Sequence, residues 1–364
     1  MAGLGLEELE VPVGIDAEQE LGGSARGEPK APTKDVVYFF ATGDCVFLVE
    51  NVLFKIHKER LTREPDPDCC FRGLFSSARD QGMSTMGEID SVYEDDGGGR
   101  FEIIPIDDKL VDFRALCWVL YALPGDIQQQ NESGADISRL VSVANMAHKY
   151  MMPSYEAWAL YMIHIHGQAP HNYFDTCSQE MLYRVFEAGL DGGRDDICVL
   201  VEARWIPRLR KDELRLRDAL DFGEKHGRRG FLGEAYYQQA LRMPSFVPMI
   251  GKAQWLDFTQ SDLTERQLGT LLRGFCSLSL LWQNLGHAQS HVSGCGYSSR
   301  NPLSDALALP RPGADSNNPL LFPDMRQALG NAIEACKREY CHCRRDYLTA
   351  VQDEFCLEHF FLGV

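Results

Sequence analysis

Thiol and imidazole side chains gather toward the C-terminal end of this 364-residue sequence, and both are common protein ligands of zinc. One group follows helical spacing and comprises His287, His291 and Cys295. A second group comprises Cys336, Cys341, His342, Cys343 and Cys356. The sequence contains no Cys-x-x-Cys pair, however, and Gly294 interrupts the helical spacing of the first group. We therefore expect these cysteines to act as small hydrophobic residues and the purified protein to hold no stoichiometric zinc; a zinc-binding C-terminal module is the alternative.

Motifs for the common catalytic chemistries are missing from the sequence. It has no Gly-x-Ser-x-Gly nucleophile turn, no His-Glu-x-x-His pair and no phosphate-binding loop. With twelve cysteines and ten histidines in the chain, some pair of these residues will match a catalytic spacing by chance. We therefore expect a protein that is not an enzyme, has no catalytic residues and needs no cofactor.

The charge balance bears on the class of partner. A net charge of -17 and an isoelectric point near 5.0 disfavour nucleic acid, because phosphate binding needs a concentrated basic surface. The basic stretch at residues 204–217 interleaves Asp212 and Glu213, which is typical of a salt-bridged helix surface. The sequence lacks a signal-peptide pattern and any run of apolar residues long enough to span a membrane, so we expect no membrane partner. Scattered cysteines favour reduced thiols and a location in the cytoplasm, the nucleus or both.

Composition divides the chain into five parts. Residues 1–34 carry seven acidic and three basic side chains and no aromatic residue, which predicts a disordered acidic segment. The other four parts are a first domain at residues 35–165, a helical extension at 170–292, a flexible linker or insertion at 293–322 and a C-terminal helical segment at 323–364.

Short apolar runs predict the strands of the first domain. Residues 36–40 form one run, and a turn at residues 42–44 separates it from residues 45–49. Asn51 then separates residues 45–49 from residues 53–56. We expect short strands here, joined by tight turns.

Further along, composition predicts a loop, a strand and a helix. Residues 76–99 are rich in Ser, Gly, Asp and Glu, which predicts a long flexible loop, and apolar residues 101–106 predict a strand. Apolar side chains at i, i+3, i+4, i+7 and i+8 predict an amphipathic helix over residues 112–123, which Pro124 ends.

Helical patterns continue to the C-terminus. One set covers residues 137–165, with a break near Pro153. A shift of 76 positions, from Lys149 to Lys225, brings similar residue types together. The other aligned pairs are Tyr155 with Phe231, Ala159 with Ala235 and Tyr161 with Tyr237. Either a true helix-turn-helix repeat or shared amphipathic packing accounts for this match.

One segment carries a multi-point signature. An Asp opens a strand and Phe-x-x-His-Lys-x-x-Leu follows, matched by Asp44, Phe54, His57, Lys58 and Leu61. A helix signature Phe-Arg-x-Leu-Phe comes next, with Phe71, Leu74 and Phe75. The segment resembles the BTB/POZ family, and looks especially like the BTB proteins expanded in basidiomycete fungi. Over residues 35–165 the resemblance implies an α+β core, a small sheet clasped by helical hairpins, followed by an all-α extension.

Two departures from the family pattern stand out. Arg63-Glu64-Pro65 replaces the usual Arg-Ser-Pro, with extra residues before Phe71, and the acidic loop at residues 76–99 replaces a short connection.

We expect the signature residues to serve folding rather than chemistry. Asp44 and His57 would pair across adjacent strands, because polar groups taken out of water need partners. The apolar members would fill a small core beneath the helix of residues 112–123, namely Phe54, Leu61, Phe71, Leu74 and Phe75.

The resemblance implies a protein-protein interaction scaffold that self-associates, captures partners, or both. It also implies two narrower alternatives, a substrate adaptor of a cullin-type ubiquitin ligase and a transcriptional co-regulator. Family adaptors contact the cullin through an apolar residue, any residue and Glu, a pattern that Met86 and Glu88 match.

The expected self-association strand consists of Val36, Val37, Tyr38, Phe39 and Phe40. Three consecutive aromatic side chains are costly to leave in water, at about 25 cal/mol per Å² of apolar surface. In proteins that this one resembles, the N-terminal strand pairs with a second copy across a two-fold axis. The alternative is that the run folds back on its own sheet.

Overall fold

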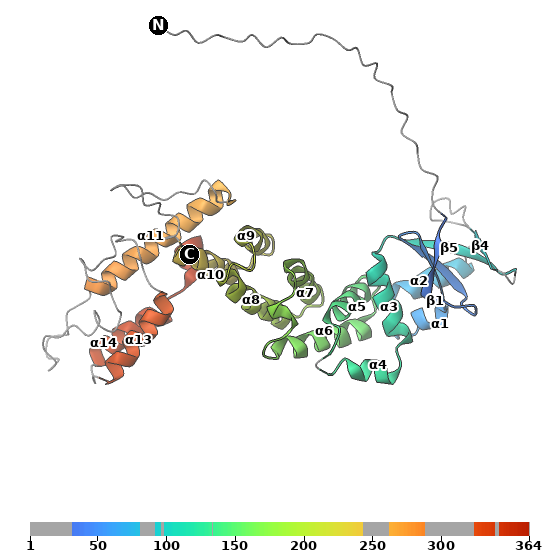
Figure 1. Ribbon diagram of the computed structural model, residues 1–364, viewed down its shortest axis with the longest axis horizontal. Coiled ribbons are helices and arrows are strands. Elements are labelled where there is room, and N and C mark those ends of the chain that lie inside the picture. The colour runs from blue at the N-terminus through green and yellow to red at the C-terminus, as the bar shows by residue number, and fades with distance from the viewer. Residues whose placement is uncertain are drawn as a thin grey trace, which may run out of the picture. The chain divides into compact units, whose positions relative to one another are not determined.

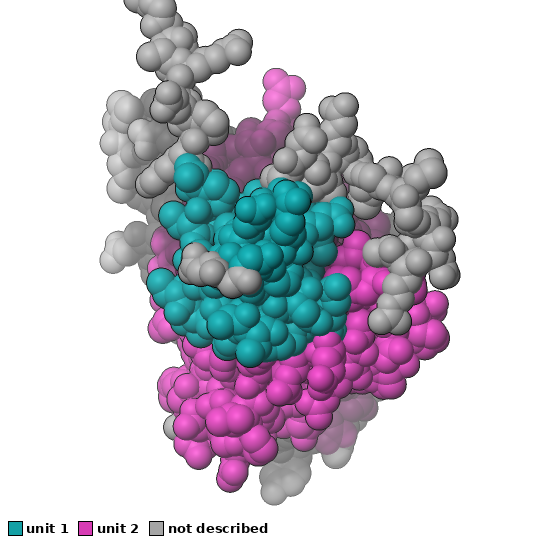
Figure 2. Space-filling view, turned by 90° about the vertical axis from the view of Figure 1, so that its right-hand side faces the viewer, with its two compact units in different colours: residues 1–58, 83–110 teal, residues 59–82, 111–364 magenta. Residues whose placement is uncertain are grey.

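The computed structural model describes residues 31–80, 92–95, 98–132, 134–242, 262–287, 324–338 and 342–363. The chain divides into two compact units, Met1–Lys58 with Met83–Leu110 and Glu59–Gly82 with Val111–Val364 (Figure 2). The first unit holds a mixed five-stranded sheet and the second is largely helical, so the protein is α+β, as predicted. The predicted linker lies outside the described residues, and so does the predicted disordered segment up to residue 30.

The strands of the first unit pair in the order β1-β3-β2-β5-β4. Figure 1 labels β1, β4 and β5 of this sheet. The strands are β1 Thr33–Phe39, β2 Cys45–Val49, β3 Val52–Ile56, β4 Val92–Glu94 and β5 Arg100–Ile106. β2 and β3 form an antiparallel hairpin, whereas β5 runs parallel to β2 and β1 runs parallel to β3. Glu50 and Asn51 close the hairpin with φ angles of 44° and 66°, the left-handed pair that matches the twist of the strands. The predicted strand boundary at Asn51 is therefore confirmed.

An apolar cluster holds this sheet together. Val46, Leu53 and Ile103 are its buried members. Partly buried side chains pack against them, namely Phe39, Leu48, Tyr93 and Phe101. Four of the five residues of β2 are buried, because the strand lies between β3 and β5 and is covered on both faces.

Helices make up most of the described remainder of the chain. The first four are α1 Lys58–Leu61, α2 Cys70–Asp80, α3 Leu110–Tyr121 and α4 Pro124–Gln129. The next six are α5 Ile137–Lys149, α6 Pro153–Gln168, α7 Gln179–Asp191, α8 Asp195–Arg210, α9 Leu216–Lys225 and α10 Arg229–Arg242, with a 3-10 turn, η1, at Tyr173–Asp175. The last four are α11 Glu265–His287, α13 Met325–Arg338, α14 His342–Asp353 and α15 Leu357–Leu362.

Three helical hairpins follow one another in the second unit, α5 with α6, α7 with α8 and α9 with α10. Their turns are equivalent, because Met151, Gly193 and Gly227 adopt φ angles of 56°, 65° and 64°. In each turn the next amide bonds to the carbonyl five residues earlier, which is how a left-handed residue ends a helix. These bonds are Met152 N to Ala147 O, Arg194 N to Gly189 O and Arg228 N to Gly223 O. The predicted shift of 76 residues thus relates the first hairpin to the third. The internal similarity of the sequence did not reveal the second hairpin.

Two local predictions need correction. The loop expected at residues 76–99 is wrong at both ends, because α2 continues to Asp80 and β4 pairs with β5 at Val92–Glu94. The helix expected at residues 112–123 is α3, which begins two residues earlier, at Leu110. The expected break near Pro153 is confirmed as the turn between α5 and α6.

Among the described residues, no helix combines the length and the apolar character needed to cross a membrane.

Candidate functional site

The predicted self-association strand, β1, lies at one edge of the sheet and has β3 as its neighbour. The register between these strands shifts between Lys34 and Phe39. Within that interval the buried Asp35 carboxylate accepts hydrogen bonds from the backbone amides of Val37 and Tyr38, each at 2.9 Å. Val36 and Val37 consequently project into solvent and are 92% and 59% exposed. The edge therefore presents two apolar side chains on an irregular strand.

The aromatic residues of this run are partly covered by the protein's own first unit. Tyr38, Phe39 and Phe40 are half-buried. Phe39 meets the Tyr93 ring edge-on at 5.5 Å between centroids, and the Lys34 ammonium lies over both rings. The aromatic part of the run thus folds back on its own sheet, as the alternative predicted. The exposed apolar surface of the run consists of Val36 and Val37.

Asp44 and His57 have partners other than each other. The Asp44 carboxylate accepts a hydrogen bond of 2.7 Å from the backbone amide of Lys58, the first residue of α1. His57 Nε2 and Thr42 Oγ1 are 3.0 Å apart, and the imidazole lies beside the Phe40 ring. Asp44 thus caps a helix instead of making the predicted pair, because orphan amides at a helix start attract a carboxylate.

The apolar signature residues divide between the units. Phe54 is buried in the first unit, and Leu61 and Phe71 are buried in the second. Leu74 and Phe75 are only half-buried. The Phe71 ring stacks on Tyr150 at 4.5 Å between centroids. A structural role for the buried members follows from their burial.

Besides Asp35 and Arg208, two further charged residues in the described part of the chain are buried, and the sequence did not predict their burial. Lys55 is 2% exposed, yet its ammonium donates to Asp95 Oδ2 at 2.9 Å and to the Ala41 carbonyl at 3.1 Å. The Phe101 ring lies 4.2 Å from the same ammonium. These contacts tie β3 to the turn after β4, and such a fully satisfied buried cation fixes the sheet arrangement without offering a reactive group.

The second is Glu64, which is 1% exposed. Its carboxylate accepts from Ser154 Oγ at 2.8 Å and from the Ser154 backbone amide at 3.3 Å, at the first turn of α6. Its carbonyl accepts from the Arg72 guanidinium on α2. Glu64 therefore caps the start of α6, which lies far from it in the sequence.

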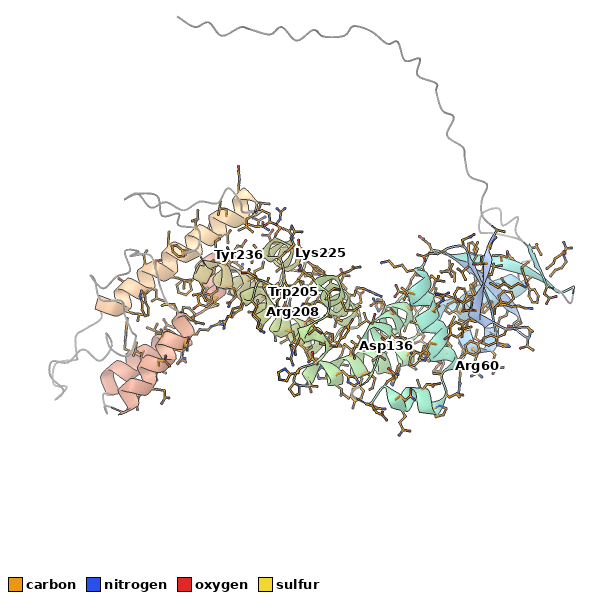
Figure 3. The ribbon with its side chains drawn as sticks, in the orientation of Figure 1. Arg60, Asp136, Trp205, Arg208, Lys225 and Tyr236 are labelled. Carbon is orange, nitrogen blue, oxygen red and sulfur yellow. The ribbon has the colours of Figure 1, made fainter. Side chains whose placement is uncertain are left out.

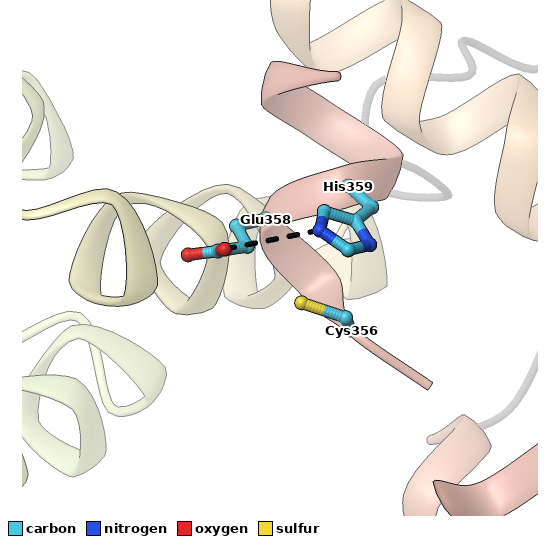
Figure 4. Close-up of side chains that lie close together, drawn as sticks. All are labelled: Cys356, Glu358 and His359. Atoms are coloured by element: carbon cyan, nitrogen blue, oxygen red, sulfur yellow. Dashed lines mark ion pairs between the residues drawn. The ribbon is translucent and has the colours of Figure 1, made fainter. Parts of the chain in front are cut away.

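Cys356, Glu358 and His359 bring a sulfur, an oxygen and a nitrogen within 4.8 Å of one another (Figure 4). All three lie within four consecutive residues at the start of α15, and the Glu358 and His359 side chains are 31% and 51% exposed. A closed zinc site has four ligands, so this trio is incomplete among the described side chains. His291, Cys295 and Cys341 lie outside the described residues, as do the side chains of His287, Cys336, His342 and Cys343.

Buried thiols in the described part of the chain are poorly suited to nucleophilic chemistry. Burial raises the pKa of Cys45 to about 12 and that of Cys198 to about 11. A reactive cysteine needs the opposite shift, toward the thiolate.

The six basic residues of the stretch 204–217 all have acidic partners. Arg204 pairs with Asp175 at 3.2 Å, and Arg217 pairs with Asp221 at 2.9 Å. The remaining pairs join Arg208 and Lys211 to Glu213, Arg210 to Asp324, and Arg215 to Asp218 and Asp262. The predicted salt-bridged surface is therefore confirmed.

A cleft of about 590 Å³ opens beside Arg208. This arginine belongs to α8 and is labelled in Figure 3. The lining of the cleft includes Cys177, Gln179 and Gln239. The Arg208 guanidinium donates to the Phe174 carbonyl at 3.1 Å and to Glu213 at 3.3 Å. Gln179 Oε1 accepts from the Arg215 amide. Gln179 Nε2 is buried without a hydrogen-bond partner among the described residues, whereas the Arg208 guanidinium is engaged within the protein. These bonds favour a structural role for Arg208.

The predicted cullin-contact residues Met86 and Glu88 lie outside the described residues.

Comparison of the sequence with protein-family models and with curated proteins found no match, and comparison with solved structures also found none.

Proposed function

We propose that this protein is a BTB/POZ-type protein-protein interaction scaffold, which self-associates through β1 and captures partners with its helical extension. The observation that carries the proposal is the order of elements. The hairpin β2-β3 is followed by α1 and α2, then by the short β4 and by β5, which runs parallel to β2, and then by α3 and helical hairpins. A small sheet followed by helical hairpins agrees with the arrangement that the resemblance over residues 35–165 implies.

The exposed edge supports the self-association part of the proposal. An edge strand presents backbone groups that another strand can pair with, and natural edges are usually protected by charged residues or proline. β1 carries the charged Lys34 and a register shift, yet it also exposes the apolar pair Val36 and Val37. A second copy that covers this pair across a two-fold axis would make a closed, self-complementary contact.

Light scattering at micromolar concentration tests the proposal. The full chain should have twice its mass of 41.0 kDa, and a chain that starts at Thr42 should be monomeric. A strictly monomeric full chain would rule out self-association and leave partner capture as the function.

Neither narrower role gains support over the other. The cullin-adaptor role depends on Met86 and Glu88, and the co-regulator role has no identified nucleic-acid-reading element in the sequence. Purification of the protein with its bound partners, followed by mass spectrometry, distinguishes these roles, because only the adaptor role predicts a cullin among them.

A further inference from the structure

The C-terminal helix α15 occupies a groove between α10 and α11. Leu357 and Phe361, four residues apart on one face of α15, are 4% and 0% exposed. The Phe361 ring stacks on Tyr236 of α10 with 5.6 Å between centroids and 15° between planes. The C-terminal end of the chain accordingly lies beside α10 in Figure 1.

Glycines form the floor of this groove. A methyl group on Gly274 of α11 would overlap the Phe361 ring, and one on Gly233 of α10 would press on the backbone of Leu357 and Glu358. Any larger residue at either position would therefore push α15 away. The groove is shaped for a helix that approaches closely and inserts an aromatic side chain.

Hydrogen bonding and the short length of α15 also indicate that the groove holds this helix in place. The Arg229 guanidinium donates to the Gly363 carbonyl at 2.6 Å, just after α15 ends. α15 has six residues and no side-chain N-cap bond. Isolated helices of that length are unstable in water, so the groove itself holds the segment helical. The segment is thus recognised by folding on a surface, as short amphipathic helices are when they bind a groove.

The chain can supply this helix to another copy. α13 follows α11 after residues 288–323, a stretch of 36 residues that spans up to about 120 Å when extended. Because Tyr237 of α10 bonds to Asp324 and to the Met325 amide at the start of α13, α13 and α14 would move with α15 and re-form these bonds on the second copy. The same α15 that fits its own groove fits an identical groove, and exchange of an identical element is a low-cost route to association.

We propose that the α10-α11 groove is a recognition site for a short amphipathic helix with Leu-x-x-x-Phe anchors, and that its partner in trans is α15 of a second copy of this chain. This contact is separate from β1. It joins copies through the helical unit and does not depend on the BTB/POZ assignment of the first unit. Because the α15 of the same chain competes for the groove, natural chains exchange α15 only well above micromolar concentration, whereas the β1 contact forms at micromolar concentration.

Complementary variants test the proposal in the full-length chain. Leu357→Ala with Phe361→Ala removes the anchors and leaves the groove open, whereas Gly274→Leu fills the groove and releases the helix. Both chains also carry Val36→Lys and Val37→Lys, which separates the result from any β1 contact. Differently tagged, the two chains should co-purify when mixed, and neither should co-purify with a tagged copy of itself. Failure of the mixed pair to associate, with both chains retaining the helical content of the natural protein by circular dichroism, would overturn the proposal.

A labelled peptide of residues 354–364 provides a second measurement if one variant fails to fold. Fluorescence anisotropy should show the peptide binding the open-groove chain about tenfold more tightly than the natural chain, whose own helix competes. The matched peptides are Phe361→Ala, which should lose binding, and Phe360→Ala, whose half-buried residue should matter little. Equal binding of both substituted peptides would show that the groove does not recognise the anchors and would contradict the proposal.

Discussion

Lys55 is buried, although lysine side chains are usually exposed to solvent. A lysine that is 2% exposed is tolerated because Asp95, the Ala41 carbonyl and the Phe101 ring all meet its ammonium group. Sequence could not reveal this, because Asp95 lies 40 positions away and follows a strand in a stretch whose composition is typical of a loop. The same holds for Glu64, whose partner Ser154 lies 90 positions away.

Removal of the Asp95 charge should loosen the sheet. Asp95→Asn leaves the Lys55 ammonium buried without its counter-charge, and we expect a loss of about 2 kcal/mol in the free energy of opening β3, since Asp95 itself is partly exposed. Hydrogen exchange of the β3 and β5 amides, read by mass spectrometry, measures this loss. The matched control is Glu94→Gln, which breaks an exposed pair with Arg100 and should cost less than about 0.5 kcal/mol. Equal effects of the two substitutions would contradict the account of Lys55.

Zinc content provides a second test at the residue scale. The Cys356, Glu358 and His359 trio is incomplete among the described side chains, so elemental analysis of the purified chain should find well under one zinc per molecule. About one zinc per chain, lost on Cys341→Ser with Cys343→Ser, would move the C-terminal segment into the class of metal modules. Loss on Cys356→Ser with His359→Gln would place the metal on α15 instead.

At the scale of elements, the sequence predicted those helices and strand boundaries that depend on local residue patterns. Alternation and turn residues predicted the boundary at Asn51, helical periodicity predicted α3, and Pro153 marked the start of α6. β4 was missed because three residues become a strand only by pairing with β5. The second helical hairpin was missed because its spacing from the others is uneven, 42 and then 34 residues between equivalent turn residues, Met151, Gly193 and Gly227.

The turn geometry makes a prediction about glycine. Gly227 has a φ of 64°, so Gly227→Ala should destabilise the helical unit by about 1 kcal/mol. Gly230, three residues later in α10, has open space around a Cβ, and Gly230→Ala should stabilise the unit by about 0.5 kcal/mol. Urea unfolding followed by the fluorescence of the tryptophans, among them the buried Trp205, gives both values. If both substitutions changed the free energy of unfolding in the same direction, the left-handed conformation of Gly227 would not be required for the hairpin.

At the scale of the whole molecule, the protein joins a sheet with an exposed apolar edge to a series of helical hairpins ended by α15. Among the described residues, the Cys45 and Cys198 thiols have raised pKa values and the Arg208 guanidinium is engaged internally. The structure exposes the apolar pair Val36 and Val37 on β1, and it holds α15 in a groove that fits a short helix. A scaffold role accounts for both.

The most direct test of the scaffold account is the mass of the full-length protein in solution when the β1 edge is altered at two points. Deletion of β1 would also uncover β3, so point substitutions are sharper. The test variant is Val36→Lys with Val37→Lys, which places two charges on the edge. The control is Leu190→Lys with Val199→Lys, at helix positions that are 48% and 51% exposed.

Light scattering at micromolar concentration should give twice 41.0 kDa for the natural chain and for the control, and 41.0 kDa for the β1 variant. A natural chain that is monomeric, or a β1 variant that remains dimeric, would contradict self-association through this edge.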